Sequence, residues 1–154
     1  MKHLLLLLLI LNLNLSFSQA KIGKEIVNTS TIYTIDESWE PKGATRFKAD
    51  ETSYVHISNG YFVMSERTRG ETLYLEGDIA DLVETTKGGI HFWIKVRGHA
   101  TIVCDINPSE EGVNIHIYNT IGRYDKYYSG RLANKEEVKK LLVVSTKSTI
   151  SPSK

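Results

Sequence analysis

The feature that most constrains the fold is an alternation of apolar and polar residues through residues 90–118. Side chains two positions apart point to the same face of a β-strand. The apolar residues fall on one parity in each of three segments: Ile90, Phe92, Ile94 and Val96; then Ala100, Ile102, Cys104 and Ile106; then Val113, Ile115 and Ile117. This pattern predicts an antiparallel meander of three strands with one buried face.

The register of this meander follows from keeping its apolar residues on one face. We expect Val96 to pair with Ala100 around a three-residue turn, and Ile106 to pair with Val113 across a loop over residues 107–112. A slip of one residue would turn every isoleucine to solvent, so the parity is better determined than the exact pairs. The predicted rows on the other face are Lys95–Thr101–Tyr118, Trp93–Val103–His116 and His91–Asp105–Asn114.

A β-hairpin is predicted over residues 53–66, because Asn59-Gly60 suits the positive φ angles of a type I′ turn. That turn pairs Ile57 with Phe62 and, further from the turn, Val55 with Met64. One face of the hairpin is then fully apolar, as in a half-buried strand pair.

The remaining segments indicate a mainly β fold. Strands are predicted near residues 32–35, 44–48, 72–76 and 123–128, and residues 78–85 read as a helical turn or a loop.

Near the end, Asn134 and Glu137 form a capping box before the apolar stripe of Val138, Leu141 and Leu142, which predicts a helix. A strand over residues 141–144 is the alternative. The fold class is therefore an antiparallel barrel or sandwich of about seven or eight strands with one C-terminal helix. This order of elements loosely resembles small secreted β-barrels such as the lipocalins, although their Gly-x-Trp motif is missing from the first strand.

The first twenty residues have the features of a secretory signal peptide. Lys2 and His3 precede an apolar run over residues 4–11, and small residues follow at 16–20. The run is short for a membrane span, so we expect no stable membrane anchor after cleavage. The predicted organisation is a signal peptide at 1–20, one β-rich domain at 21–145 and a polar tail at 146–154. The predicted location is periplasmic or extracellular.

Composition narrows the function classes. The 19 basic and 18 acidic residues are balanced, which gives no basis for a nucleic-acid partner. The chain has one cysteine, Cys104, so an intrachain disulfide is impossible. The parity of Cys104 turns it toward the core, where burial makes a thiol a poor nucleophile. No motif for a nucleotide, calcium or another cofactor is present.

The polar face of the meander carries the candidate ligand-binding residues, which are Trp93, His116, His91, Asp105, Asn114 and Tyr118. An indole beside hydrogen-bonding side chains suits a flat polar ligand such as a sugar ring or a peptide edge. The leading hypothesis is a non-catalytic binding or interaction module. A plain solvated sheet face, or one covered by the terminal helix, accounts for the same pattern.

Two further hypotheses use other groupings of residues. The first is a small hydrolase or metal-dependent enzyme that uses His91, Asp105 and His116. The second is a partner of another exported protein that binds through the tyrosines of the 124–128 segment. Alternation sends Tyr124 and Tyr128 to one side of that strand and Tyr127 to the other.

Overall fold

The part of the chain that the structure describes is a closed β-barrel with a helix packed on its outside. The computed structural model describes residues 29–43, 45–97, 101–119, 121 and 124–148. The predicted signal peptide lies outside these residues. The described elements are β1 (Thr31–Trp39), β2 (Phe47–Lys48), β3 (Tyr54–Ser58), β4 (Tyr61–Thr68), β5 (Glu71–Glu84), β6 (Ile90–Lys95), β7 (Ile102–Ser109), β8 (Gly112–Asn119), β9 (Asp125–Leu132) and α2 (Lys135–Ser148).

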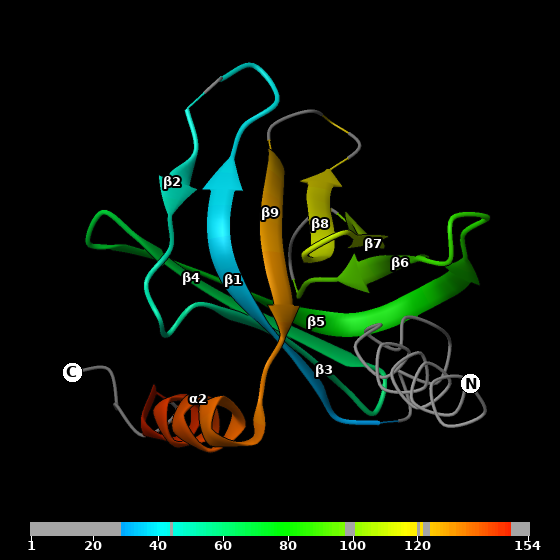
Figure 1. Cartoon of the computed structure of the whole chain (residues 1–154). Helices are drawn as coiled ribbons and strands as arrows, with labels where there is room; N and C mark the ends of the chain where they lie inside the picture. Colours follow the sequence, from blue (N-terminus) through cyan, green and yellow to red (C-terminus); the bar gives the residue numbers. More distant parts are fainter. Residues whose placement is uncertain (1–28, 44, 98–100, 120, 122–123, 149–154) are drawn as a thin grey trace, which may run out of the picture.

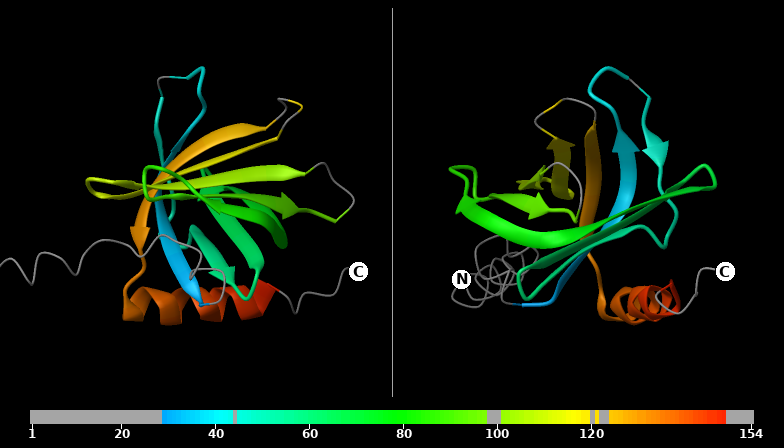
Figure 2. Two further views of the ribbon diagram at one scale, coloured as in Figure 1. Left: turned by 90° about the vertical axis from the view of Figure 1, so that its right-hand side faces the viewer. Right: turned by 180° about the vertical axis from the view of Figure 1, so that it is seen from behind.

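Eight antiparallel strands form the barrel, because β1 pairs with β3 on one side and with β9 on the other. The short strand β2 adds to β1 outside this closed ladder. Figures 1 and 2 show the strongly curved sheet closing on itself, with α2 below it. The mainly β class and the single C-terminal helix are therefore confirmed, and the barrel alternative is the correct one.

The core lies inside the barrel and consists of the apolar side chains that point inward from each strand. Fifteen buried residues form one cluster, among them Phe62, Phe92, Ile94, Ile106 and Tyr128. Phe62 and Phe92 contact each other at 5.9 Å between ring centroids. Burial of these apolar side chains is the main stabilising contribution expected in a chain without disulfides.

The 53–66 hairpin has the predicted register, with Ile57 opposite Phe62 and Val55 opposite Met64. Its turn residues Asn59 and Gly60 have φ angles of 50° and 75°, as a type I′ turn requires.

The 78–85 interpretation was wrong, since β5 continues through Glu84. Asp81 has a φ angle of 52° and lies in an irregularity between Ala80 and Val83. This break in the alternation explains why the segment does not read as a strand in sequence. The predicted strand at 44–48 is reduced to Phe47 and Lys48, and residue 44 lies outside the described part.

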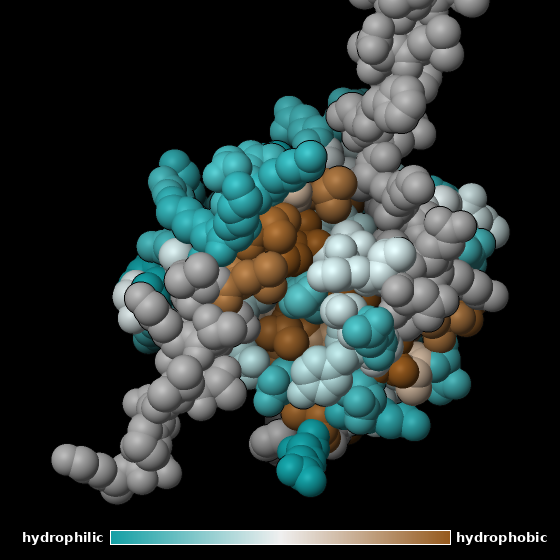
Figure 3. Space-filling model, turned by 90° about the horizontal axis from the view of Figure 1, so that it is seen from below, coloured by the Kyte–Doolittle hydropathy of each residue, from teal (hydrophilic) through white to brown (hydrophobic). Residues whose placement is uncertain are grey.

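Helix α2 packs against the outer face of β1, β3 and β4. Leu141 is 3% exposed and contacts the buried Ile32 and Tyr54. The Asn134 side chain accepts hydrogen bonds from the backbone N–H of Glu136 and Glu137, and the Glu137 carboxylate accepts one from the N–H of Asn134. The predicted capping box is therefore present, and the strand alternative at 141–144 was wrong. The helix also continues through Ser148, into the predicted polar tail. From below, hydrophobic residues are visible in the middle of this side of the molecule, bordered by hydrophilic ones (Figure 3).

Candidate functional site

The outer face of the barrel carries one row of side chains that crosses five neighbouring strands. Backbone pairing aligns His91 of β6, Asp105 of β7, His116 of β8, Tyr127 of β9 and Trp39 of β1. All five have the outward parity of their strands and are partly exposed. We call these five residues, with the adjacent Trp93 and Tyr118, the aromatic row.

Carboxylates connect and orient the two imidazoles of this row. His91 Nδ1 lies 2.6 Å from Asp105 Oδ1, and His116 Nε2 lies 2.7 Å from Asp125 Oδ1. The second oxygen of Asp105 is 3.8 Å from His116 Nδ1. The carboxylate of Asp105 thus lies between both histidines, and the two short contacts, His91 with Asp105 and His116 with Asp125, orient the imidazole rings.

Four rings form a continuous stack along the row. The ring centroids of Trp39 and Tyr127 are 5.8 Å apart, those of Tyr127 and His116 are 4.0 Å apart, and those of His116 and Tyr118 are 4.5 Å apart. The interplanar angles are 12°, 3° and 24°. Each ring therefore packs against the next, which stabilises this arrangement of side chains.

A cation extends the stack at the Trp39 end. The guanidinium of Arg46 lies 4.5 Å from the Trp39 ring centroid, close enough for a cation–π interaction. Arg46 also donates to the carboxylate of Glu37 at 3.2 Å.

The other end of the row is formed by Trp93 and Tyr118, which flank Val103 on the same face. Val103 points outward yet is only 1% exposed, so the neighbouring side chains cover it. His91 meets Trp93 edge-on, with centroids 6.4 Å apart. Partial burial here raises the pKa of Tyr118, and the nearby Asp105 adds to the effect.

The exact rows predicted from sequence were wrong by two residues across β7 and β8. Ile106 pairs with Ile115, and not with Val113, because β7 and β8 continue to a two-residue turn between Ser109 and Gly112. The observed rows are His91–Asp105–His116 and Trp93–Val103–Tyr118. Parity survives a shift of two, so the inward and outward assignments are unchanged.

All six predicted ligand-binding residues lie on the outward face of neighbouring strands, five of them in the aromatic row and Asn114 beside it. Asn114 lies opposite Asn107 and Ser129, two positions along the strand from His116. Sequence reasoning missed Trp39, Tyr127 and Asp125 as members of this surface. Alternation did place Tyr127 on the other face of its strand from Tyr124 and Tyr128. The missing information was that β9 lies beside β8 and that β1 closes the barrel, since both depend on contacts distant in sequence.

A second polar cluster lies inside the barrel, and the sequence analysis did not identify it. The carboxylate of Glu66 is 2% exposed and accepts hydrogen bonds from three hydroxyl groups, those of Ser38, Thr68 and Tyr128, at 2.6, 3.1 and 3.2 Å. The ammonium of Lys126 lies 3.1 Å from it. The hydroxyls of Tyr124 and Tyr128 are 2.6 Å apart. We call these six residues the inner cluster.

Burial governs the titration of groups inside the barrel. It raises the pKa of the Tyr124 and Tyr128 hydroxyls and raises that of Tyr33 to about 12. Cys104 is fully buried, and burial raises the pKa of its thiol well above the usual value. The predicted inward orientation of Cys104 is therefore confirmed.

No protein-family model matches this chain, and no curated protein matches it. Among the described residues, no helix is both long and apolar enough to cross a membrane. Within those same residues, no group of three or more His, Cys, Asp or Glu side chains is arranged to hold a metal ion.

Proposed function

We propose that this protein is a secreted, non-catalytic binding module that recognises a glycan through the aromatic row. The observation that carries the proposal is the unbroken stack from Trp39 to Tyr118 on the outside of the barrel. Secretion rests on the apolar leader over residues 4–11.

The chemistry of the row suits a ligand with several hydroxyl groups. Rings stacked face to face leave their edges rather than their faces for a ligand, and the phenol and indole edges of the row carry hydrogen-bonding groups. The carboxylates of Asp105 and Asp125 add acceptors at the same level of the surface. A row held in place by mutual stacking loses little side-chain freedom when a ligand binds, which favours affinity.

The row also contains a built-in reporter. The chain has two tryptophans, Trp39 and Trp93, and both lie on this surface. Titrating glycan panels and peptide panels while exciting tryptophan therefore monitors the proposed site alone. We expect a saturable spectral change with a glycan.

The decisive variant is Tyr127→Ala, which removes the middle of the stack. Loss of a central aromatic contact should weaken binding roughly tenfold or more. Tyr61→Ala is the matched control, because Tyr61 is an exposed tyrosine (38%) outside the row. Equal affinity in both variants, or no spectral change with any glycan, would refute the proposal. A response to peptides alone would point to a peptide-binding module.

The competing proposal is a small hydrolase or metal-dependent enzyme that uses His91, Asp105 and His116. In its favour, Asp105 contacts both imidazoles and could orient His91 as a general base. Turnover of an ester or glycoside substrate that is abolished by Asp105→Asn would favour this enzyme over the binding module.

A further inference from the structure

An open pocket of about 550 Å³ lies at the end of the barrel where β6, β7 and β8 end or begin. The residues that line it are Tyr74, Leu75, Glu76, Val96, Arg97, Ile102, Asn119 and Ile121. Leu75 pairs with the fully buried Met64, and Ile102 pairs with the fully buried Ile94. The pocket is therefore a continuation of the inside of the barrel.

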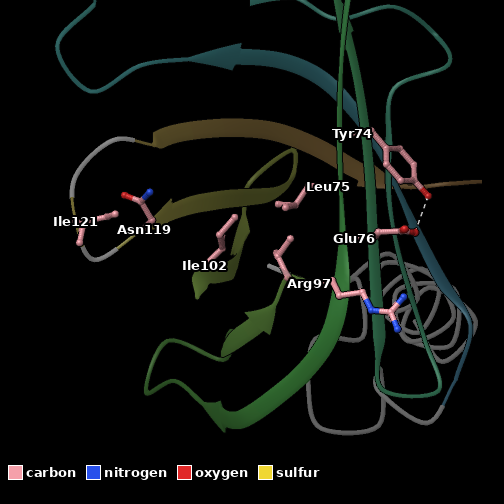
Figure 4. A pocket seen from close by; sticks show the side chains of 8 residues that line it. Tyr74, Leu75, Glu76, Arg97, Ile102, Asn119 and Ile121 are labelled. Atoms are coloured by element: carbon pink, nitrogen blue, oxygen red, sulfur yellow. Dashed lines mark hydrogen bonds between the residues drawn. The ribbon is translucent and has the colours of Figure 1, made fainter. Parts of the chain in front are cut away.

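Polar and apolar groups are separated around this pocket. In Figure 4, Leu75 and Ile102 extend into the space between the strands, whereas Tyr74 and Glu76 lie on the other side of β5, joined by a hydrogen bond of 2.9 Å. The guanidinium of Arg97 extends toward that same outer side. The inner wall is therefore aliphatic except for Asn119, which pairs with Ile102 and has the same inward parity, and the charged groups lie at the rim.

The rim carries an exposed aliphatic side chain. Ile121 is 64% exposed beside the opening. Exposed aliphatic surface next to an aliphatic hollow becomes favourable when a ligand covers both. A volume of this size suits a small organic molecule. The backbone of Ile102 is paired on both sides, with Ile94 and Asn119, so the inner wall at this strand is already part of the sheet.

We propose that this pocket binds a small aliphatic amphiphile, such as a medium-chain alcohol or acid. Its hydrocarbon part lies against Leu75, Val96, Ile102 and Ile121, and its polar end faces solvent at the rim near Arg97. This site is separate from the aromatic row: Ile102 lines the pocket, whereas the next residue, Val103, lies on the outer face between Trp93 and Tyr118.

The proposal is tested with 1-octanol as an uncharged probe, followed by amide chemical-shift changes in two-dimensional NMR and by calorimetry at several temperatures. We expect saturable shifts centred on Leu75, Val96 and Ile102, and a negative heat-capacity change from buried apolar surface. Shifts centred on the Trp39 and Trp93 indoles, or no saturable shift at all, would overturn the proposal.

Substitutions sharpen the test. Ile121→Asn removes aliphatic surface from the rim and should weaken 1-octanol binding at least fivefold. Val83→Asn is the matched control, because Val83 is similarly exposed (55%) but does not line the pocket. Leu75→Phe should also weaken binding by filling the hollow, without loss of the folded NMR spectrum.

Trp93→Ala should leave 1-octanol binding unchanged, so failure of the glycan proposal and failure of this one are distinguishable. Equal affinity for 1-octanol in Ile121→Asn, Leu75→Phe and the wild type would refute the site.

Discussion

The inner cluster and the aromatic row use similar residue types on opposite faces of the same strand. In β9, Lys126 and Tyr128 point inward to Glu66, whereas Asp125 and Tyr127 point outward to His116. Each face therefore combines tyrosine with a carboxylate and a basic group. The alternation of a single strand supplies both surfaces.

The two regions differ in their access to water. Inside, the Glu66 side chain is 2% exposed, so every unpaired charge or hydroxyl there has a large desolvation cost. Outside, the Asp125 side chain is 46% exposed, and water compensates for a lost partner. The inner cluster should consequently govern stability, and the aromatic row should govern recognition.

The largest expected effect is that of Glu66→Ala. This substitution leaves the hydroxyl of Tyr128 and the ammonium of Lys126 without their carboxylate partner. Removing one member of a fully buried ion pair costs about 3–5 kcal/mol of unfolding free energy. Because the Lys126 side chain is 28% exposed, the loss should fall near the lower end of this range. Urea unfolding measures this loss. A double variant, Glu66→Leu with Lys126→Met, should be less destabilised because no unpaired charge remains. A loss below about 1 kcal/mol in Glu66→Ala would remove the distinction between the two regions.

A loss of stability of intermediate size is expected at alkaline pH. Burial raises the pKa of Tyr33 from 10.0 to about 12 in the folded protein. The neutral hydroxyl is thus favoured by folding, so this contribution is complete below pH 10 and is lost as the pH rises through about 12. A pKa change of this size corresponds to roughly 2–3 kcal/mol. Urea midpoints between pH 8 and 12, with tyrosinate absorbance, measure the loss.

Tyr33→Phe is the control for this titration. Within the described residues, the Tyr33 hydroxyl is buried without a hydrogen-bond partner. Its removal should therefore change stability little at pH 7 and should reduce the decline above pH 10. If stability above pH 10 declines equally in this variant, the decline is caused by other tyrosines, such as Tyr124 and Tyr128.

The smallest effect is expected from Asp125→Asn on the outer face. The contact between Asp125 and His116 is partly exposed, so its loss should cost less than about 1 kcal/mol. Urea unfolding again gives the value, and tryptophan fluorescence during glycan titration gives the effect on binding. A stability loss as large as that of Glu66→Ala would show that the aromatic row has mainly a structural role.

Local patterns predicted much of this fold. Asn59-Gly60 defined its hairpin pair by pair, because a two-residue turn leaves one register. Asn134 and Glu137 marked the start of the helix through contacts within one turn. The parity of Cys104 and Ile106 was also correct, since only one face of the meander is apolar.

Features that depend on distant contacts were not predictable in the same way. Residues 107–112 read as a loop because they include Pro108 and two glutamates, yet Pro108 pairs with Val113 in the sheet. The buried carboxylate of Glu66 is satisfied by Ser38 and Lys126, which lie on other strands. The alignment of Trp39 with Tyr127 requires the barrel to close, and no short segment encodes that closure.

The pairing of β1 with β9 also affects how the chain is made. Tyr33 pairs with Leu132, so the first strand of the barrel finds one of its partners only after the last strand has left the ribosome. Until then, the edge of β1 that faces β9 has no partner. Long sequence separation of contacts slows folding and prolongs exposure of such surfaces. The chain therefore remains open to aggregation until β9 has paired with β1 and closed the barrel.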